Sequence, residues 1–363
     1  MNTANDRQGV GKGTGTGMEE AGGKQGAAEV SRVPVPRKHL FIINPVSFRT
    51  GTSMDAFIAG VKDQFERVIK EEYDIRISRF PRHAIRTVRQ YITQAGPERA
   101  VRVYAVGGDG ILFDCLNGIV GLPNADLAPV PYGRNSDFVR AFGEGREDSF
   151  RNIPLLAAAP AVPTDILHCG SNYALNLCIV GLESASVFKT VAMQQKLKSW
   201  PRFIRNSTRI YNMIYYLGGF TVLFDHKLLN QEYTIVLDGE NVSGAYASVN
   251  IANGPCYGGD KSAVVTAVPN DGLMDVLMLK GMGTLVGLRM VLPYTNGHYD
   301  YFPENTVLKR GKSISIRSKE PLIINLDGET FLDTNITVEL IKGAVNIAAP
   351  DNLSYKQGGP FRG

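Results

Sequence analysis

The chain has 363 residues, of which 44% are hydrophobic and 20% are charged, and its formal net charge is +4. This is the balance of a globular protein that is long enough for two domains. The charge is too small to indicate nucleic acid as a partner, although a local basic patch would favour phosphates or an anionic surface. The four cysteines form no CxxC pair and no metal-ligand spacing, which indicates reduced, packed thiols in a cytoplasmic protein.

Residues 1–36 are rich in glycine and hold almost no large apolar side chain. Such a segment cannot bury enough surface to offset its ordering entropy, so we expect a disordered tail. It also lacks the apolar core of a signal peptide. The uncharged stretch 210–224, which has much apolar content, is shorter than the roughly 20 apolar residues that span a bilayer. We therefore expect at most a peripheral contact with a membrane.

The chain from Lys38 onward alternates buried strands with amphipathic helices. Ser53 can cap the first helix. This order predicts a doubly wound parallel sheet with ligands at the carboxyl ends of its strands. The predicted strands are 38–43, 73–78, 100–106 and 127–131. The apolar faces of the first two helices are Met54, Phe57, Ile58, Val61, Phe65, Val68 and Ile69, and then Ala84, Ile85, Val88 and Ile92.

After residue 160 the pattern changes to strands separated by turn residues. Asp238-Gly239 and Asp327-Gly328 are hairpin-turn dipeptides, and helices are predicted at 183–197 and 202–218. We therefore expect a β-sandwich with added helices. Its predicted strands are 162–169, 172–181, 231–237, 244–252, 273–280, 312–318, 321–326 and 336–342.

The sharpest local signal is Gly107-Gly108-Asp109-Gly110, which follows a predicted strand and opens a helix. Glycines let the backbone approach a ligand closely, and the N–H groups at the start of a helix can bind an anion. Asp109 could hold a metal-bound phosphate or a ribose hydroxyl. A tight strand–helix turn capped by Asp109 explains the tetrapeptide equally well. It is not a Walker A loop, because no Gly-Lys-Ser/Thr follows.

Two more loops reach the same edge of the predicted sheet. Asn44-Pro45 follows the first strand, and Pro131-Tyr132-Gly133-Arg134 follows the fourth. Because the carboxyl ends of parallel strands meet at one edge, the three loops should converge. Their convergence favours a nucleotide site over unrelated turns.

Six sequence blocks occur in order along the chain: FIINPVS, VGGDG, PYGRNSDFVRAFG, IANGPCYGG, PNDGLMDV and INLDGE. Together they resemble the diacylglycerol-kinase catalytic family, whose relatives include bacterial lipid kinases, sphingosine kinases and, more distantly, NAD kinases. The resemblance implies an α/β nucleotide-binding domain over 37–158 and a β-sandwich substrate and metal domain over 159–342. It places the active site in the cleft between them and lets the segment 343–355 return to the first domain.

The resemblance also implies an ATP- and Mg²⁺-dependent lipid kinase that transfers the γ-phosphate to a hydroxyl of diacylglycerol or a related lipid. The implied nucleotide contacts are Asn44, Pro45, Val46, Ser47, Ser78, Gly107, Gly108, Asp109, Gly110, Ile111, Leu112, Phe113, Gly133 and Arg134.

Three of these positions depart from the family pattern. Ile111 and Arg134 stand where threonine is usual, and Phe113 stands where asparagine is usual. Two hydroxyls that could bond phosphates are therefore missing, and Arg134 could replace one of them with a charge-assisted contact.

The run 268–273 resembles the family segment that binds a structural Mg²⁺. The implied ligands are the carboxylate of Asp271 and the backbone carbonyls of Val268 and Leu273. Oxygen ligands suit this ion. Taken alone, the Asn-Asp-Gly sequence at this place is simply a turn.

The resemblance assigns catalysis to Glu329, Asp327 and Asp109. Glu329 is the implied acceptor of the proton from the substrate hydroxyl, and Asp327 is the implied orienter of the metal and its waters. Independently of any family, phosphoryl transfer needs in-line positioning, charge neutralisation and a proton acceptor.

Two other functions stay open, namely a kinase of a soluble acceptor such as NAD and a catalytically weak nucleotide or lipid sensor. Basic and aromatic residues mix in 196–216, which suits the headgroup region of a membrane. A solvated basic face on a covering helix explains them as well. We expect peripheral contact with the inner membrane face, and the sequence leaves a homodimer open.

Overall fold

The computed structural model describes residues 37–48, 53–133, 136–196, 220–258 and 264–356. The glycine-rich segment 1–36, the predicted helix 202–218 and Arg134 lie outside these residues. Among the residues described, no helix is long and apolar enough to cross a bilayer. All four cysteines are free and buried, as predicted.

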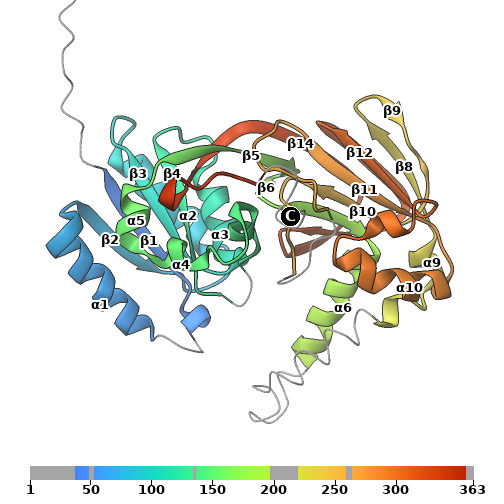
Figure 1. Ribbon diagram of the computed structural model, residues 1–363, viewed down its shortest axis with the longest axis horizontal. Helices are drawn as coiled ribbons and strands as arrows, with labels where there is room; N and C mark the ends of the chain where they lie inside the picture. Colours follow the sequence, from blue (N-terminus) through green and yellow to red (C-terminus); the bar gives the residue numbers. More distant parts are fainter. Residues whose placement is uncertain (1–36, 49–52, 134–135, 197–219, 259–263, 357–363) are drawn as a thin grey trace, which may run out of the picture. The chain divides into compact units, whose positions relative to one another are not determined.

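The first half of the described chain is a parallel sheet with helices, as predicted (Figure 1). Its strands pair in the order β2-β1-β3-β4, and Phe41 of β1 lies opposite both Ile75 and Tyr104. Nearly all side chains of β1, β3 and β4 are buried, as expected for parallel strands covered on both faces. The strands are β1 (Lys38–Ile43), β2 (Glu72–Ile77), β3 (Val101–Gly107) and β4 (Ala125–Pro131). The helices are α1 (Met54–Gln64), α2 (His83–Ala95), α3 (Asp109–Ile119), α4 (Glu147–Arg151) and α5 (Ile153–Ala158).

Helix α1 begins where the sequence predicts. The side-chain oxygen of Ser53 accepts the backbone N–H of Ala56 at 3.0 Å. Phe57 and Phe65 of the predicted apolar face are buried, but Val68 is 65% exposed, so the prediction for Val68 was wrong. The reason is a π-helical turn, η2 (Phe65–Ile69), which moves the following residues off the 3.6-residue period.

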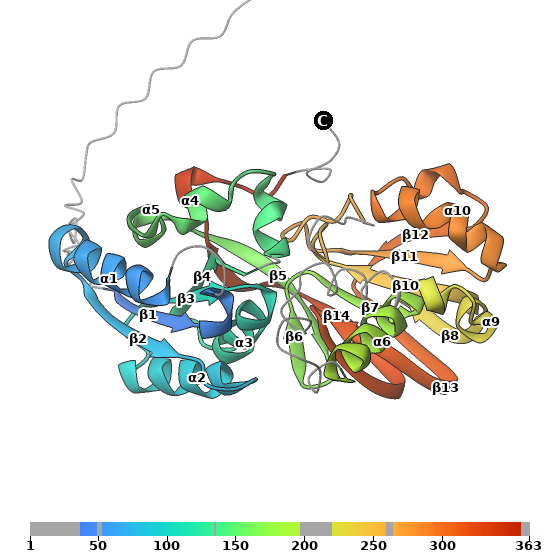
Figure 2. The same ribbon diagram turned by 90° about the horizontal axis from the view of Figure 1, so that it is seen from below.

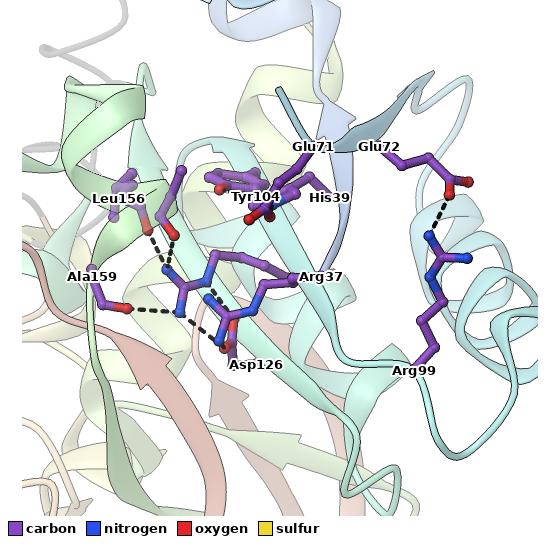
Figure 3. Close-up of polar contacts among 11 residues, drawn as sticks. Arg37, His39, Glu71, Glu72, Arg99, Tyr104, Asp126, Leu156 and Ala159 are labelled. Carbon is purple, nitrogen blue, oxygen red and sulfur yellow. Dashed lines mark hydrogen bonds and ion pairs between the residues drawn. The ribbon is translucent and has the colours of Figure 1, made fainter. Parts of the chain in front are cut away.

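A buried polar cluster lies at the amino ends of the parallel strands (Figure 3). Arg102 of β3 is fully buried and forms two hydrogen bonds with Asp126 of β4, at 2.7 and 3.0 Å. Its other donors bond the carbonyls of Leu156 and Ala159 at α5. Arg102 therefore fastens α5 to the sheet at the point where the chain leaves for its second half.

The second half is rich in β-strands, as predicted (Figure 2). Its strands follow the order β12-β11-β10-β7-β13-β14, and β8 pairs with β10 and β13. Successive side chains of β11 point to opposite faces of the sheet. Val276 packs in a core formed by strand residues such as Ile324, whereas Leu277 packs with Met290 and Tyr294 of α10. The strands are β5 (Ala161–Cys169), β6 (Asn172–Ala174), β7 (Leu177–Gly181), β8 (Gln231–Leu237), β9 (Glu240–Asn241), β10 (Gly244–Ala252), β11 (Met274–Lys280), β12 (Thr306–Gly311), β13 (Ser313–Leu326) and β14 (Glu329–Ala348). The helices are α6 (Leu182–Lys196), α9 (His226–Leu229) and α10 (Thr284–Thr295).

Strand β14 belongs to both halves. It pairs with β13, then with β5, and near its end Ile347 pairs in parallel with Leu127 of β4. Val345, Ile347 and Tyr355 pack in the core of the first sheet. One strand therefore links the parallel sheet directly to the hairpin that carries Glu329.

The predicted hairpin dipeptides form hairpins, but other strand predictions were coarser than the structure. Leu237 pairs with Glu240, and Leu326 pairs with Glu329. Strand β13 is one strand where two were predicted, because the register shift between Arg317 and Leu322 bends it without ending it. The stretch 172–181 is two strands, and β12 and α10 were not predicted.

Candidate active site

Three loops converge at the carboxyl ends of the parallel strands, as predicted. A Cβ atom on Gly107 would lie 2.9 Å from Oγ of Ser47 and 3.2 Å from Cβ of Asn44, both in the loop after β1. A Cβ atom on Gly133, after β4, would lie 2.3 Å from Cα of Gly108. Glycine is required at both positions because only a residue without a side chain lets the loops approach so closely.

The loop after β3 leads straight into α3, whose first turn presents backbone N–H groups. Gly108 is the N-cap and offers no side chain to these groups, and Gly110 is exposed. The first N–H groups of a helix have no partner within it, and the helix dipole favours negative charge there. This arrangement can bind a phosphate.

Asn44 and Ser78 are held at the same edge by backbone hydrogen bonds. Asn44 donates its N–H to the carbonyl of Val106 at 3.0 Å, and its side chain accepts the N–H of Val46 at 3.1 Å. Ser78 donates its N–H to the carbonyl of Ile43 at 2.8 Å. Pro45 and Ser47 follow Asn44 directly, in the 3-10 turn η1 (Pro45–Phe48). The structure therefore brings these predicted nucleotide contacts together.

The side chains of Ile111, Leu112 and Phe113 point into the protein. They are 4%, 7% and 2% exposed, so they can contact a nucleotide only through their backbone. Phe113 packs in the core of the second half, whereas Ile111 packs in the core of the first. Ile111 and Phe113, which replace the usual polar residues, therefore change the packing of the two cores before they change any contact with a nucleotide.

The turn that precedes Glu329 is fastened to the segment between β6 and β7. The carboxylate of Asp327 accepts the backbone N–H groups of Leu175 at 2.7 Å, Asn176 at 3.1 Å and Leu177 at 2.8 Å. Three such bonds occupy the oxygens of Asp327 and leave it poorly placed to take a proton from a substrate. These hydrogen bonds hold the turn against the segment between β6 and β7.

Asp109 and Asp327 come from opposite halves of the chain, and their charges interact. Burial, together with the charge of Asp327, raises the pKa of Asp109 to about 6, although the N–H of Asp137 donates to its Oδ1 at 3.0 Å. Burial also raises the pKa of Asp327 to about 6, against the three N–H groups that lower it. A cation bound near these carboxylates would favour their charged forms.

Glu329 begins β14 and faces a residue of the first half. Nη2 of Arg82 lies 3.4 Å from its Oε2, and Nη1 of Arg82 donates to Oδ1 of Asn172 at 3.3 Å. The guanidinium lies over the ring of Phe113, 4.6 Å from its centroid. The side chains of Arg82 and Glu329 are 39% and 46% exposed, so their ion pair contributes at most about 1 kcal/mol and remains accessible to a ligand.

Asp114 of α3 completes this group. Burial raises the pKa of Asp114 to about 6; the charge of Arg82 lowers it and the charge of Glu329 raises it. The site residues predicted from the sequence did not include Arg82, Asp114 or Asn172. The position of Arg82 just after the second predicted strand was an available signal, because ligand-binding residues follow the carboxyl ends of such strands. No pattern in the sequence pointed to Asn172.

The predicted magnesium ligands lie in the turn before β11. Oδ1 of Asp271 accepts the N–H of Leu273 at 3.0 Å, and Oδ2 pairs with Arg310 of β12. Arg310 also bonds Asp275, opposite it in the β11–β12 pairing. A Mg²⁺ ion at this carboxylate would have to displace the guanidinium, so the residues as arranged suit Arg310 rather than the ion. The assignment of Val268, Asp271 and Leu273 as ligands stays a prediction.

Comparison with known proteins matches both halves of the chain. The family model described as the diacylglycerol kinase catalytic domain matches residues 38–169. The model described as the YegS C-terminal NAD kinase beta sandwich-like domain matches residues 204–349.

Individual relatives are distant in sequence. The diacylglycerol kinase of Bacillus subtilis (strain 168) is 26% identical over 242 residues, which are 65% of this chain and 75% of that protein. The probable lipid kinase YegS-like of Pseudomonas syringae pv. syringae (strain B728a) is 26% identical over 291 residues, 80% of this chain and 88% of that protein. The crystal structure of a diacylglycerol kinase from Bacillus anthracis str. Sterne has a similar fold, with a TM-score of 0.59 and 18% identity over 88% of this chain and 98% of that one.

The two family models account for the parallel sheet with its phosphate-type loop and for the β-rich half with its Asp-Gly turn, in the order in which they occur along this chain. Residues 38–169 therefore form a diacylglycerol kinase catalytic domain and residues 204–349 a YegS-type C-terminal β-sandwich domain, and this homology supports a kinase.

Proposed function

We propose that this kinase transfers the γ-phosphate of ATP, bound as its Mg²⁺ complex, to a hydroxyl of diacylglycerol or a related lipid. The observation that carries the proposal is the placement of the turn before Glu329. That turn brings Asp327 close enough to interact with the charge of Asp109, which opens α3. A proton acceptor and a phosphate-binding helix terminus therefore share one site.

In this mechanism the nucleotide phosphates bind the N–H groups at the start of α3. The acceptor hydroxyl lies between the γ-phosphate and Glu329. The bond from the acceptor oxygen to the γ-phosphorus forms while the bond to the β,γ-bridging oxygen breaks. The hydroxyl proton passes to Glu329, and ADP leaves with the electron pair of the bridging oxygen. Mg²⁺ bound to the nucleotide would neutralise part of the phosphate charge.

The names of the relatives and the surface of α10 support a lipid acceptor. Leu285 and Leu292 are 77% and 69% exposed on α10, and Phe224 is exposed close to α9. Exposed apolar side chains suit a shallow contact with a bilayer surface. We propose that the protein works in the cytoplasm and contacts the inner membrane face peripherally.

The test is transfer of label from γ-labelled ATP to a panel of lipids in vesicles, with and without Mg²⁺. We expect labelled lipid only with Mg²⁺, and a loss of at least about 100-fold in Glu329→Gln with an unchanged Tm, because the proton acceptor is removed. Glu339→Gln, further along β14, is the matched control and should retain full activity. Full activity in Glu329→Gln would refute the assignment of the base.

The same assay separates the two alternatives. Label in NAD but in no lipid would identify a kinase of a soluble acceptor. The sensor alternative is motivated by Ile111 and Phe113, where the usual polar groups are absent. A nucleotide-induced rise in Tm without transfer to any acceptor would support that sensor and overturn the proposed kinase.

A further inference from the structure

Arg82 has a backbone conformation that is unfavourable for arginine. Its φ is +65° and its ψ is 2°, in the left-handed region that glycine occupies most easily. It precedes α2, yet its side chain makes no capping bond to that helix. A residue other than glycine persists in such a conformation only when its surroundings hold it there, and these residues cluster at functional sites.

The side chain of Arg82 is held by both halves of the chain. The ring of Phe113, from α3, lies under the guanidinium and is itself 2% exposed, so it forms a rigid platform. Asn172, from β6, accepts one hydrogen bond, and Glu329, from β14, accepts another. The guanidinium is therefore fixed beside the proposed proton acceptor, with Asp114 close enough to feel its charge.

We propose that Arg82 binds the phosphoryl group during its transfer and stabilises the negative charge of the transition state. This inference rests on the proposed function. If Glu329 takes the hydroxyl proton, the acceptor oxygen lies within about 3 Å of its carboxylate. The phosphorus atom bonds that same oxygen, so a guanidinium 3.4 Å from Oε2 of Glu329 is within reach of the phosphoryl oxygens.

The chemistry of arginine suits this task. Its planar guanidinium has five N–H donors, which match phosphate oxygens in pairs. In the described part of the chain, Arg82 has two side-chain hydrogen bonds, to Asn172 and Glu329, so three donors remain for a phosphate. The pair with Glu329 is half-exposed and weak, so an arriving phosphate can replace the carboxylate. That exchange also frees Glu329 to accept the proton.

Arg82→Gly provides a sharp test, because it removes the guanidinium and relieves the unfavourable φ at once. We expect a Tm equal to or above that of the wild type, and a fall in kcat of about 100-fold to 1,000-fold with little change in KM for the lipid. Arg82→Lys, which keeps the charge and loses the planar fork, should recover part of kcat. Arg86→Ala is the matched control, since Arg86 is exposed one turn further along α2.

The outcomes are distinguishable from a failure of the proposed function. Wild-type protein that phosphorylates no acceptor contradicts the kinase mechanism itself. An active wild type with an equally active Arg82→Gly variant overturns the inference alone. A faster Arg82→Gly variant does so too, since Arg82 would then restrain Glu329. A raised KM for ATP with unchanged kcat would also overturn it, because the contact would then serve nucleotide binding and not the transition state. If the glycine variant folds poorly, Arg82→Gln serves in its place. It keeps neutral donors, and its kcat should fall as far as that expected for Arg82→Gly; an unchanged kcat would overturn the inference.

Discussion

Single residues set the electrostatics of the site. Asp109, Asp114 and Asp327 each have a pKa raised to about 6, with burial as the main cause. At neutral pH, a carboxylate with a raised pKa is ionised at a cost to the free energy of unfolding. Proteins keep such groups mainly where they bind a cation or a reacting group. The carboxylates are therefore evidence for a site, beyond the resemblance of their sequence blocks.

The pH dependence of stability tests this view at Asp109. Its pKa in the folded protein, about 6, lies above the ordinary value of 3.8, so its contribution to stability is complete below the ordinary value and is lost as the pH rises through 6. Asp109→Asn keeps an oxygen for the N–H of Asp137 but carries no charge. We expect the variant to match the wild type near pH 4 and to be about 1–3 kcal/mol more stable at pH 8, with transfer activity lost.

Thermal unfolding between pH 4 and pH 8 measures this difference. Asp148→Asn serves as the control, because the Asp148 side chain is 93% exposed and should show no such dependence. A difference in Tm between Asp109→Asn and the wild type that stays constant with pH would contradict the raised pKa.

At the level of secondary-structure elements, two Asp-Gly turns are stabilised in the same way. Asp238 and Asp327 both have left-handed φ, 47° and 46°, and both carboxylates accept backbone N–H groups from a neighbouring segment. The partners of Asp238 are exposed, whereas those of Asp327 are part-buried. Only the second turn lies beside the phosphate-type loop. The hairpin at Asp327 is therefore a rigid support for Glu329.

Alanine substitution of the two turn aspartates tests whether each one stabilises the fold and whether it is also needed for transfer activity. Asp327→Ala leaves three N–H groups without their acceptor, and we expect a loss of about 3 kcal/mol in the free energy of unfolding. Asp238→Ala should lose about 1 kcal/mol, because water can reach its partners. Urea unfolding measures both losses. Transfer activity per folded molecule should fall in Asp327→Ala and persist in Asp238→Ala; an active, fully stable Asp327→Ala variant would show that the carboxylate does not hold the turn.

At the scale of the whole molecule, the site depends on how the two halves are joined. Strand β14 runs from Glu329 into the parallel sheet, and α5 leads from that sheet into β5. The buried pair of Arg102 and Asp126 ties α5 down. Damage to this pair should therefore loosen the joint between the halves, although it lies at the opposite end of the strands from the site.

A double-mutant cycle tests the joint. Arg102→Met leaves Asp126 without its main partner in a buried place, and we expect a loss of about 3–5 kcal/mol by urea unfolding. Asp126→Leu combined with Arg102→Met removes both charges and should lose clearly less than Arg102→Met alone. Asp126→Leu alone completes the cycle, and a double variant whose loss equals the sum of the two single losses would show that the pair is not coupled.

Features that local chemistry encodes could be predicted from the amino-acid sequence alone. Buried runs of apolar residues marked β1, β3 and β4, Ser53 marked the start of α1, and Asp-Gly dipeptides marked both hairpins. The Gly107–Gly110 run marked the phosphate-type loop, because only glycine permits the close approach seen there. These features depend on periodicity or turn geometry over a few residues, and they could be recognised without a partner in space.

The contact between Glu329 and the first half of the chain could be seen only in the folded protein. Arg82 and Glu329 lie 247 residues apart, and no local pattern links them. The ring of Phe113, which the family pattern marked only as a departure, became the platform for Arg82 once α3 was seen to pack against the β-rich core. Contacts of this kind depend on the packing of distant elements, and that packing reflects burial over the whole fold, which no short stretch of sequence contains.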